Sequence, residues 1–412
     1  MRPRKTIRLV SLFLLFVLGT GSASGTTHRK KRRKTAPSAR STQLRVGPVT
    51  HGVTGSKQSI LGGPWRTPTF ADSTEGDSLD GDDLTVRRAA VQALGRYNGT
   101  VIVADPQTGR ILTIVNQKLA FQSGFQPCST IKIVAALAGL AEGTLRNQST
   151  LFHITSRQTI NLTQALARSN NQFFAAVGVQ LGYNKIVEYA HLFGLGEKAG
   201  LNLDREQPGS LTDQTPAGGL GMMTSFGEGI HMTPLELTAV MTAVANGGTL
   251  YYLQHPRTQQ EINQFMPRVK RQLDIAQWLA EIKPGLMGAV EYGTARRANF
   301  NPIEPIFGKT GTCTDDRMPT HLGWFGSYQE SGDYKLVVVV LLTGGQAVNG
   351  PIASGVAGAV YRNLSQDNYF GKSAPSSPIA STPAQSCCTL NRSNAVTRWP
   401  ARRSGITEHF AR

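Results

Sequence analysis

The chain has 412 residues, a formal net charge of +17 and a hydrophobic content of 40%. This length and apolar content suffice for one large domain or two smaller ones, which excludes a chain disordered throughout and a polytopic membrane protein. The charge is uneven, because residues 1–45 carry 12 basic and no acidic side chains, whereas residues 46–362 carry 25 basic and 24 acidic ones. The long middle segment is nearly neutral, so we expect no nucleic-acid partner.

The N-terminus has the pattern of a secretory signal. Basic residues at positions 2–8 precede an apolar run over residues 9–18, and small residues including Ala23 follow. The run is shorter than the roughly 20 residues that cross a bilayer. We expect residues 1–24 to be a signal peptide or, alternatively, a short membrane anchor. The protein is then exported, to the periplasm or the outer face of the cytoplasmic membrane.

Two further segments have the composition of unfolded chain. Residues 25–83 begin with a basic run at 28–34 and continue as a stretch rich in Gly and Ser that ends in acidic residues, which predicts a linker. The basic run is suited to contact a membrane surface or wall polymer. Residues 367–412 are expected to be a disordered tail. The folded domain is therefore expected over residues 84–366.

The pattern of this domain changes from strands to helices and back. A helix over residues 84–94 precedes a predicted hairpin, whose strands at 99–104 and 110–115 flank an Asp-Pro turn. Helical patterns dominate residues 129–245, and a last helix is expected over 352–364. Three more strands are expected over residues 306–312, 322–328 and 334–343. This order predicts an α+β fold, with a five-stranded antiparallel sheet flanked by helices and an all-helical subdomain.

Two short motifs lie in the helical part. Ser129 and Lys132 form an S-x-x-K motif, whose spacing places the hydroxyl and the amine on one helix face. A lysine in partly apolar surroundings has a lowered pKa and can accept the hydroxyl proton. Ser169 and Asn171 form an S-x-N motif, which can relay a proton and bind a substrate amide. Each motif alone is also explained by a helix cap or a loop.

The third motif lies on a predicted strand. Lys309 and Thr310 are a suitable pair for binding a carboxylate, and Gly311 allows a ligand backbone to lie close to the strand. Thr312 follows with an outward N–H. Taken alone, this K-T-G-T run is also compatible with an ordinary strand end.

In this order and at these separations, the three motifs resemble the signature of penicillin-recognising serine enzymes. The resemblance extends over residues 97–364 and is closest to the transpeptidase domain of class B penicillin-binding proteins, which cross-link peptidoglycan. The hairpin around residues 104–112, the run T-P-L at 233–235 and A-N-G-G at 245–248 are all similar to that family. Glu228 stands where the family pattern has Gln.

The resemblance implies roles for the catalytic residues. Ser129 attacks the D-Ala–D-Ala carbonyl of a peptidoglycan stem peptide and becomes acylated. Lys132 is the general base, and Ser169 relays the proton to the leaving amine. Lys309 shapes the electrostatic field at the terminal carboxylate. No cofactor is implied, and no metal-ligand spacing occurs among the four Cys and eight His.

The resemblance also implies how substrate is bound. Asn171 binds the substrate amide, and the terminal carboxylate is held by the K-T-G-T strand, including Thr310, Gly311 and Thr312. Backbone N–H groups of Ser129 and Thr312 form the oxyanion hole. β-Lactams are expected as covalent inhibitors, and a glycosyltransferase is a possible partner.

Two cysteines flank these motifs, Cys128 before the serine and Cys313 after K-T-G-T. In the family's fold the start of the serine helix faces this strand, which implies a Cys128–Cys313 disulfide in an exported protein. Some class A carbapenem-hydrolysing β-lactamases have a bridge at the matching places.

Three alternatives remain open. A class A β-lactamase needs an E-x-x-L-N loop that is not found between Ser169 and Lys309, and class D normally has Val at the position of Asn171. A D,D-carboxypeptidase uses water as acceptor, and the sequence does not separate it from a transpeptidase. A non-catalytic sensor of β-lactams or muropeptides is disfavoured because all the catalytic residue types are present.

Overall fold

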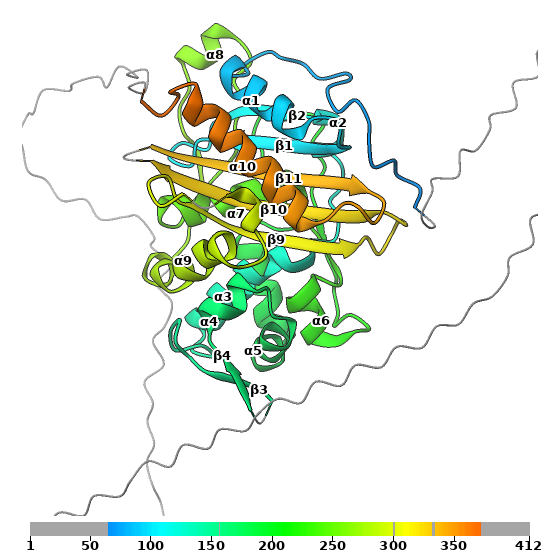
Figure 1. Cartoon of the computed structure of the whole chain (residues 1–412), viewed down its shortest axis with the longest axis vertical. Helices are drawn as coiled ribbons and strands as arrows, with labels where there is room; N and C mark the ends of the chain where they lie inside the picture. The colour runs from blue at the N-terminus through cyan, green and yellow to red at the C-terminus, as the bar shows by residue number, and fades with distance from the viewer. Residues whose placement is uncertain (1–64, 156, 300, 332–333, 372–412) are drawn as a thin grey trace, which may run out of the picture. The chain divides into compact units, whose positions relative to one another are not determined.

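The computed structural model describes residues 65–371, except residues 156, 300 and 332–333 (Figure 1). The expected signal segment and basic run lie outside the described residues, as does most of the expected tail. Within the described part of the chain, no helix combines the length and apolarity needed to span a bilayer.

A five-stranded antiparallel sheet forms the centre of the domain, with strand order β2-β1-β11-β10-β9. Its strands are β1 (Gly99–Ala104), β2 (Ile111–Val115), β9 (Ile306–Thr314), β10 (His321–Ser331) and β11 (Tyr334–Gly344). The strands from the two ends of the domain thus share one sheet, which confirms the predicted fold class.

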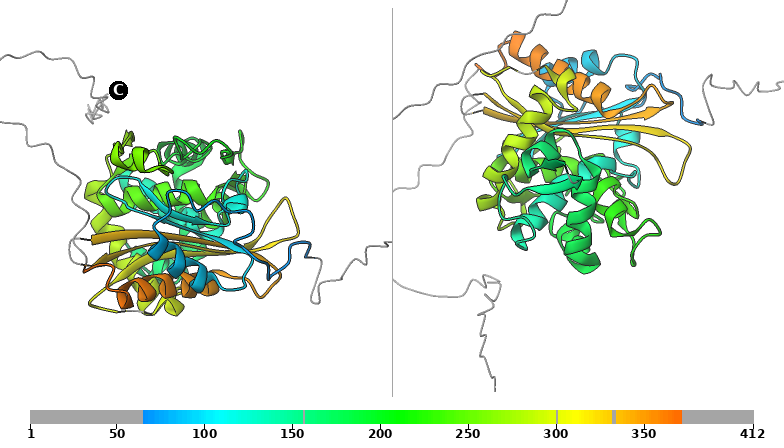
Figure 2. Two further views of the ribbon diagram at one scale, coloured as in Figure 1. Left: turned by 90° about the horizontal axis from the view of Figure 1, so that it is seen from above. Right: turned by 60° about the horizontal axis from the view of Figure 1, so that its bottom comes forward.

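Both faces of this sheet are covered, which explains the unbroken apolar run of β11. Val338 faces the smaller core, beneath α1 (Leu84–Leu94) and α10 (Gly350–Gln366). Val339 faces the opposite, larger core. Figure 2 shows the sheet between the layer that contains α10 and the helices drawn in green. Because side chains alternate along a strand, one run of valines and leucines fills two cores.

The helical subdomain lies on the second face. Its central helix, α3, is apolar on every side after its first residue, Lys132, and all but its last residue are buried, as expected for a helix enclosed by others. The larger helices here are α3 (Lys132–Ala141), α4 (Leu162–Ala167), α5 (Asn171–Leu192), α6 (Gly219–Phe226), α7 (Pro234–Asn246) and α9 (Ala276–Glu291). Of these, α7 packs directly on β1, β10 and β11.

Short elements complete the description. The small helices are α2 (Gln117–Ala120), α8 (Gln259–Asn263) and the 3-10 turns Cys128–Ile131 and Arg296–Ala298. Three two-stranded ribbons are formed by β3 (Phe152–Thr155) with β4 (Gln158–Ile160), β5 (Ser210–Leu211) with β6 (Ile230–His231), and β7 (Thr249–Tyr251) with β8 (Val269–Gln272).

The C-terminal part of the expected linker belongs to the folded domain, because residues 65–83 pack against the sheet domain. Arg87 of α1 makes ion pairs with Asp77 and Asp82, and both carboxylates are almost fully buried. A buried guanidinium requires such partners, since an unpaired charge is costly to bury. Two acidic residues of this stretch, Asp77 and Asp82, therefore belong to a buried ion-pair network, whereas Asp72, Glu75 and Asp80 are exposed.

Candidate active site

The S-x-x-K and S-x-N motifs meet at the amine of Lys132, the first residue of α3. Its Nζ lies 2.6 Å from the Oγ of Ser129. The same nitrogen donates to Oδ1 of Asn171 at 2.7 Å and lies 3.3 Å from Oγ of Ser169. These separations are within hydrogen-bond reach, so the structure brings together all four polar residues of the two motifs.

The expected helix from residue 129 begins differently, because Ser129 lies in a 3-10 turn that precedes α3. Cys128 has a left-handed backbone conformation, with φ of 51°. Thr130 closes the turn by donating its hydroxyl to the Pro127 carbonyl at 2.6 Å. Ser169 is also left-handed, with φ of 56°. Such conformations are uncommon outside glycine and cluster at functional sites.

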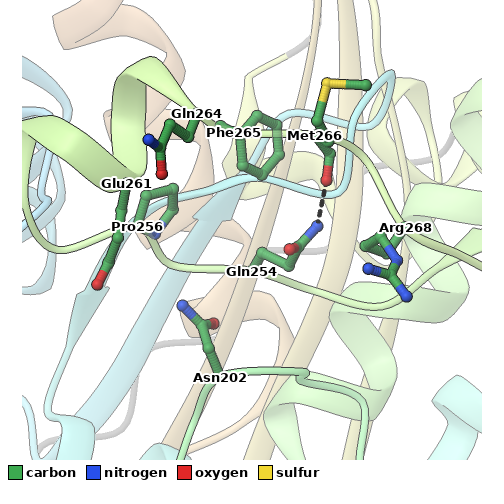
Figure 3. Close-up of a pocket in the computed structure, with 8 residues that line it drawn as sticks. All are labelled: Asn202, Gln254, Pro256, Glu261, Gln264, Phe265, Met266 and Arg268. Carbon is green, nitrogen blue, oxygen red and sulfur yellow. Dashed lines mark hydrogen bonds between the residues drawn. The ribbon is translucent and has the colours of Figure 1, made fainter.

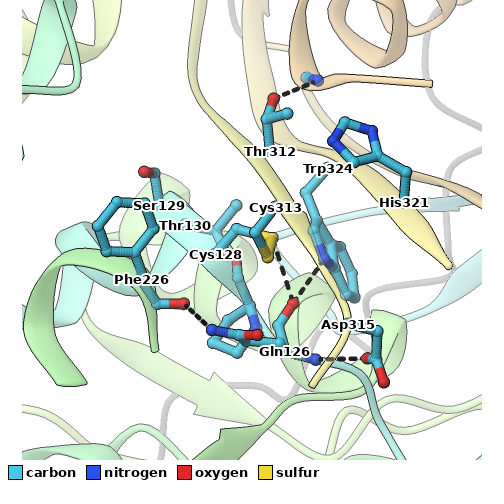
Figure 4. The surroundings of a disulfide bond; sticks show 12 residues. Gln126, Cys128, Ser129, Thr130, Phe226, Thr312, Cys313, Asp315, His321 and Trp324 are labelled. Carbon is cyan, nitrogen blue, oxygen red and sulfur yellow. Dashed lines mark hydrogen bonds between the residues drawn. A yellow bond between two sulfur atoms is a disulfide. The ribbon is translucent and has the colours of Figure 1, made fainter. Parts of the chain in front are cut away.

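A disulfide joins Cys128 to Cys313, with the two Cα atoms 5.6 Å apart (Figure 4). The predicted pairing is therefore present in the structure. It fixes β9 against the turn that carries the serine. At the same contact, a Cβ on Gly311 would lie 2.9 Å from the Pro127 carbonyl oxygen. Glycine is needed here because the strand approaches the turn this closely.

Burial controls the protonation of Lys132. Its side chain has no exposed surface, and this desolvation lowers the pKa of the amine to about 7. The rings of Phe174 and Phe226 lie 5.8 and 5.7 Å from the nitrogen and contribute to the apolar surroundings. At neutral pH a large fraction of the amine is therefore unprotonated and able to accept a proton from Ser129.

The third motif presents a second buried amine. Lys309 is fully buried and its Nζ donates to the Thr310 carbonyl at 2.9 Å. Burial lowers the pKa of this amine strongly, and the positive charge of Lys132 lowers it further. Among the described residues, no carboxylate contributes to the pKa shift of either lysine. No carboxylate among the described residues competes for these two amines, and a bound anion would favour their protonated, positively charged forms.

The hydroxyl groups of the third motif bond to other elements. Oγ1 of Thr310 lies 2.6 Å from Oγ1 of Thr294, which precedes the 3-10 turn Arg296–Ala298. Oγ1 of Thr312 accepts a hydrogen bond from the Gly350 N–H, at the start of α10, at 2.7 Å (Figure 4). The predicted carboxylate-binding strand is thus braced from two sides.

Sequence reasoning missed several residues of the site. The Ser225 carbonyl accepts a 3.4 Å hydrogen bond from the Ser129 hydroxyl, and the Ser225 hydroxyl donates to the Asn171 carbonyl at 2.9 Å. Gln126 donates its side-chain amide to the Phe226 carbonyl at 3.2 Å (Figure 4). These contacts join the end of α6 to the nucleophile turn. The only signal in the sequence that could have identified Ser225 as a site residue was its position shortly before Gly227 and Glu228.

A separate cavity of about 380 Å³ lies away from these motifs (Figure 3). Its amide side chains are largely engaged in the fold. Gln254 donates to the Met266 carbonyl at 3.0 Å, and Asn202 exchanges hydrogen bonds with the His255 backbone. The lining includes none of the motif residues. No group of three or more potential metal-ligating side chains occurs among the described residues.

The fold agrees with a family comparison. Residues 99–366 match the model of the penicillin binding protein transpeptidase domain. This is more than half of the chain, and the match includes all three motifs. The protein belongs to the penicillin-binding protein transpeptidase family, which confirms the resemblance drawn from its motifs.

Individual relatives are distant. Stage V sporulation protein D of Bacillus subtilis is 26% identical over 282 residues, which cover 61% of this chain and 44% of the relative. Peptidoglycan D,D-transpeptidase PbpA of Mycolicibacterium smegmatis is 24% identical over 346 residues, covering 66% of this chain and 69% of the relative. The chain thus spans less than half the length of the first relative and about two thirds of the second.

A solved structure shares the fold. It is the D,D-transpeptidase domain of a peptidoglycan glycosyltransferase from Eggerthella lenta, which matches with a TM-score of 0.57 at 21% sequence identity. The alignment covers 69% of this chain and 82% of the solved one. At this identity, the likeness establishes the fold alone.

Proposed function

We propose that the protein is an exported peptidoglycan D,D-transpeptidase with Ser129 as its nucleophile. The observation that carries this proposal is the contact between Lys132 and Ser129. A serine hydroxyl lies 2.6 Å from a buried amine whose pKa is lowered to about 7. This is the arrangement of an activated serine, in which the base is unprotonated at working pH and within reach of the proton.

In the first step, neutral Lys132 accepts the hydroxyl proton while Oγ of Ser129 attacks the carbonyl between the last two D-Ala residues of a stem peptide. The C–N bond then breaks and an acyl-enzyme ester forms. The departing D-Ala amine takes up a proton through Ser169, whose Oγ lies 3.3 Å from the lysine amine. Backbone N–H groups of Ser129 and Thr312 stabilise the negative charge on the carbonyl oxygen.

The strand side of the site binds the substrate's terminal carboxylate. The bound carboxylate favours the protonated form of Lys309, which then supplies positive charge, and the hydroxyls of Thr310 and Thr312 supply hydrogen bonds. Gly311 lets the substrate backbone approach the strand, while Asn171 binds the substrate amide. The absence of negative charge supports this assignment of carboxylate binding to the strand side, since the described residues around both lysines provide no competing carboxylate.

In the second step, an amine of another stem peptide attacks the ester, so an amide cross-link forms and Ser129 is released. β-Lactams acylate the same serine and act as covalent inhibitors. The reaction requires a location outside the cytoplasm, which supports the periplasm or the outer face of the cytoplasmic membrane. A glycosyltransferase that supplies glycan strands is the expected partner, and the basic N-terminal run is suited to contact the membrane surface or the wall.

Labelling with a fluorescent penicillin tests this proposal. The wild-type protein is expected to carry a stable label, and Ser129→Ala is expected to carry none. Ser149→Ala, at an exposed serine outside the site, is the matched control and should label like wild type. Absence of label on the wild type would overturn the proposal. Label that is lost within seconds would instead indicate a β-lactamase, because rapid hydrolysis of the ester is that enzyme's reaction.

A further inference from the structure

Thr294 connects two of the three motifs. Its backbone N–H donates to the carbonyl of Ala167, the last residue of α4, at 3.1 Å. Its hydroxyl lies 2.6 Å from the hydroxyl of Thr310. Ala167 is two residues before Ser169 in the chain. One residue between α9 and β9 therefore joins the segment that leads into S-x-N to the strand that carries K-T-G-T.

The position of Thr294 is fixed by its neighbours rather than by its own side chain. A Cβ on Gly293 would lie 2.0 Å from the Ala167 carbonyl oxygen, so this approach requires glycine. The Gly293 N–H donates to Gly288 at 2.8 Å, and the Ala295 N–H donates to Ala289 at 2.7 Å. Backbone hydrogen bonds on both sides of Thr294 hold this segment in place. The Thr294 hydroxyl is therefore not needed to fix the segment and can orient Thr310.

The numbers of donors and acceptors determine which hydroxyl donates in the Thr294–Thr310 contact. A hydroxyl has one proton to donate and two lone pairs that accept. An ionised carboxylate only accepts, so Thr310 must donate its proton to a bound carboxylate. Thr310 is almost fully buried, with 3% exposure, so solvent does little to satisfy its oxygen. When ligand is bound, the 2.6 Å contact must then run from Thr294, as donor, to Thr310, as acceptor.

We propose that Thr294 is a positioning residue for recognition of the substrate's terminal carboxylate and acts through Thr310. The inference rests on the proposed function, since it assumes that Thr310 binds that carboxylate. By donating to Thr310, Thr294 occupies one lone pair and turns the Thr310 proton towards the ligand. Without this donor, the Thr310 hydroxyl rotates among several orientations, and the carboxylate is bound more weakly.

The test combines a protein change with a ligand change. Thr294→Val keeps the shape of the side chain and removes the hydroxyl, whereas Thr294→Ser keeps the hydroxyl. Acylation of each protein is measured by mass spectrometry with benzylpenicillin and with its methyl ester, which lacks the ionised carboxylate. For Thr294→Val we expect acylation by the free acid to fall up to about tenfold, the upper range for loss of one neutral hydrogen bond. The loss should appear in the half-saturating concentration.

With the methyl ester, the same variant should react within about twofold of wild type. Thr294→Ser should restore most of the acylation by the free acid, and Thr294→Val should have little further effect in a Thr310→Val background, because the two hydroxyls act in series. An equal loss for acid and ester would show a purely structural role and overturn the inference, as would no loss for either.

Failure of the inference and failure of the proposed function give different results. If benzylpenicillin does not acylate wild-type Ser129, the proposed function fails and the inference fails with it. If wild type is acylated but Thr294→Val treats acid and ester alike, only the inference fails. Thermal unfolding of each variant identifies any loss that arises from misfolding, and Thr294→Ser provides the folded comparison.

Discussion

The two sides of the active site are built differently. On the helical side, the amine of Lys132 contacts Ser129, Ser169 and Asn171, so the polar groups satisfy one another. On the strand side, the hydrogen bond of Lys309 within the described part of the chain is to a backbone carbonyl, and the threonine hydroxyls bond to elements outside the motif. In the proposed mechanism, the nucleophile is therefore in place before substrate binds, whereas the strand side acquires an anionic partner only from the substrate's carboxylate.

The largest expected effect comes from replacing the two lysines, because each replacement should change a different kinetic quantity. Lys132→Met fills the same buried space without an amine, so loss of the general base should lower the acylation rate constant by about 10²–10⁴-fold. Lys309→Met should mainly raise the concentration of penicillin needed for half-saturation, because it removes the amine that becomes protonated and pairs with the bound carboxylate. Stopped-flow acylation over a range of penicillin concentrations measures both quantities. Equal effects of the two changes on both quantities would contradict the division into two sides.

The disulfide is the covalent link between the two sides. It joins residues 185 positions apart, so removing it frees a long loop in the unfolded chain. The double change Cys128→Ala and Cys313→Ala should lower the free energy of unfolding by about 2–4 kcal/mol. Denaturant titration measures this loss, and a reductant should destabilise the wild type but not the double variant. Non-reducing peptide mapping of the oxidised protein that finds both thiols free would contradict this account.

At saturating penicillin, the pH dependence of the acylation rate constant reports on Lys132 of the helical side. Because burial lowers the pKa of Lys132 to about 7, the amine loses its proton as pH rises through that value. Acylation should fall about tenfold per pH unit below about 7 and level off above about 8. The residual reaction of Lys132→Met should lack this rise. A wild-type rate that increases only near pH 10 would show that the lysine keeps its ordinary pKa.

The same shift has a consequence for stability. The unfolded chain holds the Lys132 proton up to about the ordinary value of 10.5, whereas the folded protein releases it near 7. Between these values the unfolded state binds more protons, so this group makes the free energy of unfolding rise with pH. Lys132→Met should remove that contribution.

The smallest expected effect concerns the support of the nucleophile turn. Gln126 donates its backbone N–H to Asp315 at 3.2 Å and its side-chain amide to the Phe226 carbonyl at 3.2 Å, and its carbonyl accepts from the Trp324 indole at 3.0 Å (Figure 4). Gln126→Met removes only the side-chain bond and should cost about 1 kcal/mol of stability. Chemical denaturation tests this value. A loss as large as that of the disulfide variant would show that this amide supports more than one local contact.

Local patterns were sufficient to predict the sheet and the three motifs. The run of valines and leucines in β11, the turn between β1 and β2, and the spacing of Ser129 and Lys132 are all encoded in short segments. Other features depend on residues far apart in sequence. The Thr294–Thr310 contact and the carbonyl of Ser225 at the nucleophile require the tertiary fold. The segment before α1 has the composition of a linker, and the sequence does not show that Arg87 pairs with two of its carboxylates inside the folded domain.

The most direct test of the central claim is D-amino acid exchange on a stem peptide that ends in D-Ala–D-Ala. The protein is incubated with this donor and an excess of a different free D-amino acid as amine acceptor, and the products are separated by mass. We predict that wild type replaces the terminal D-Ala by the added D-amino acid, and that Ser129→Ala yields no exchanged product. A wild-type protein that is labelled by penicillin but only hydrolyses the donor, or leaves it intact, would contradict transfer to an amine.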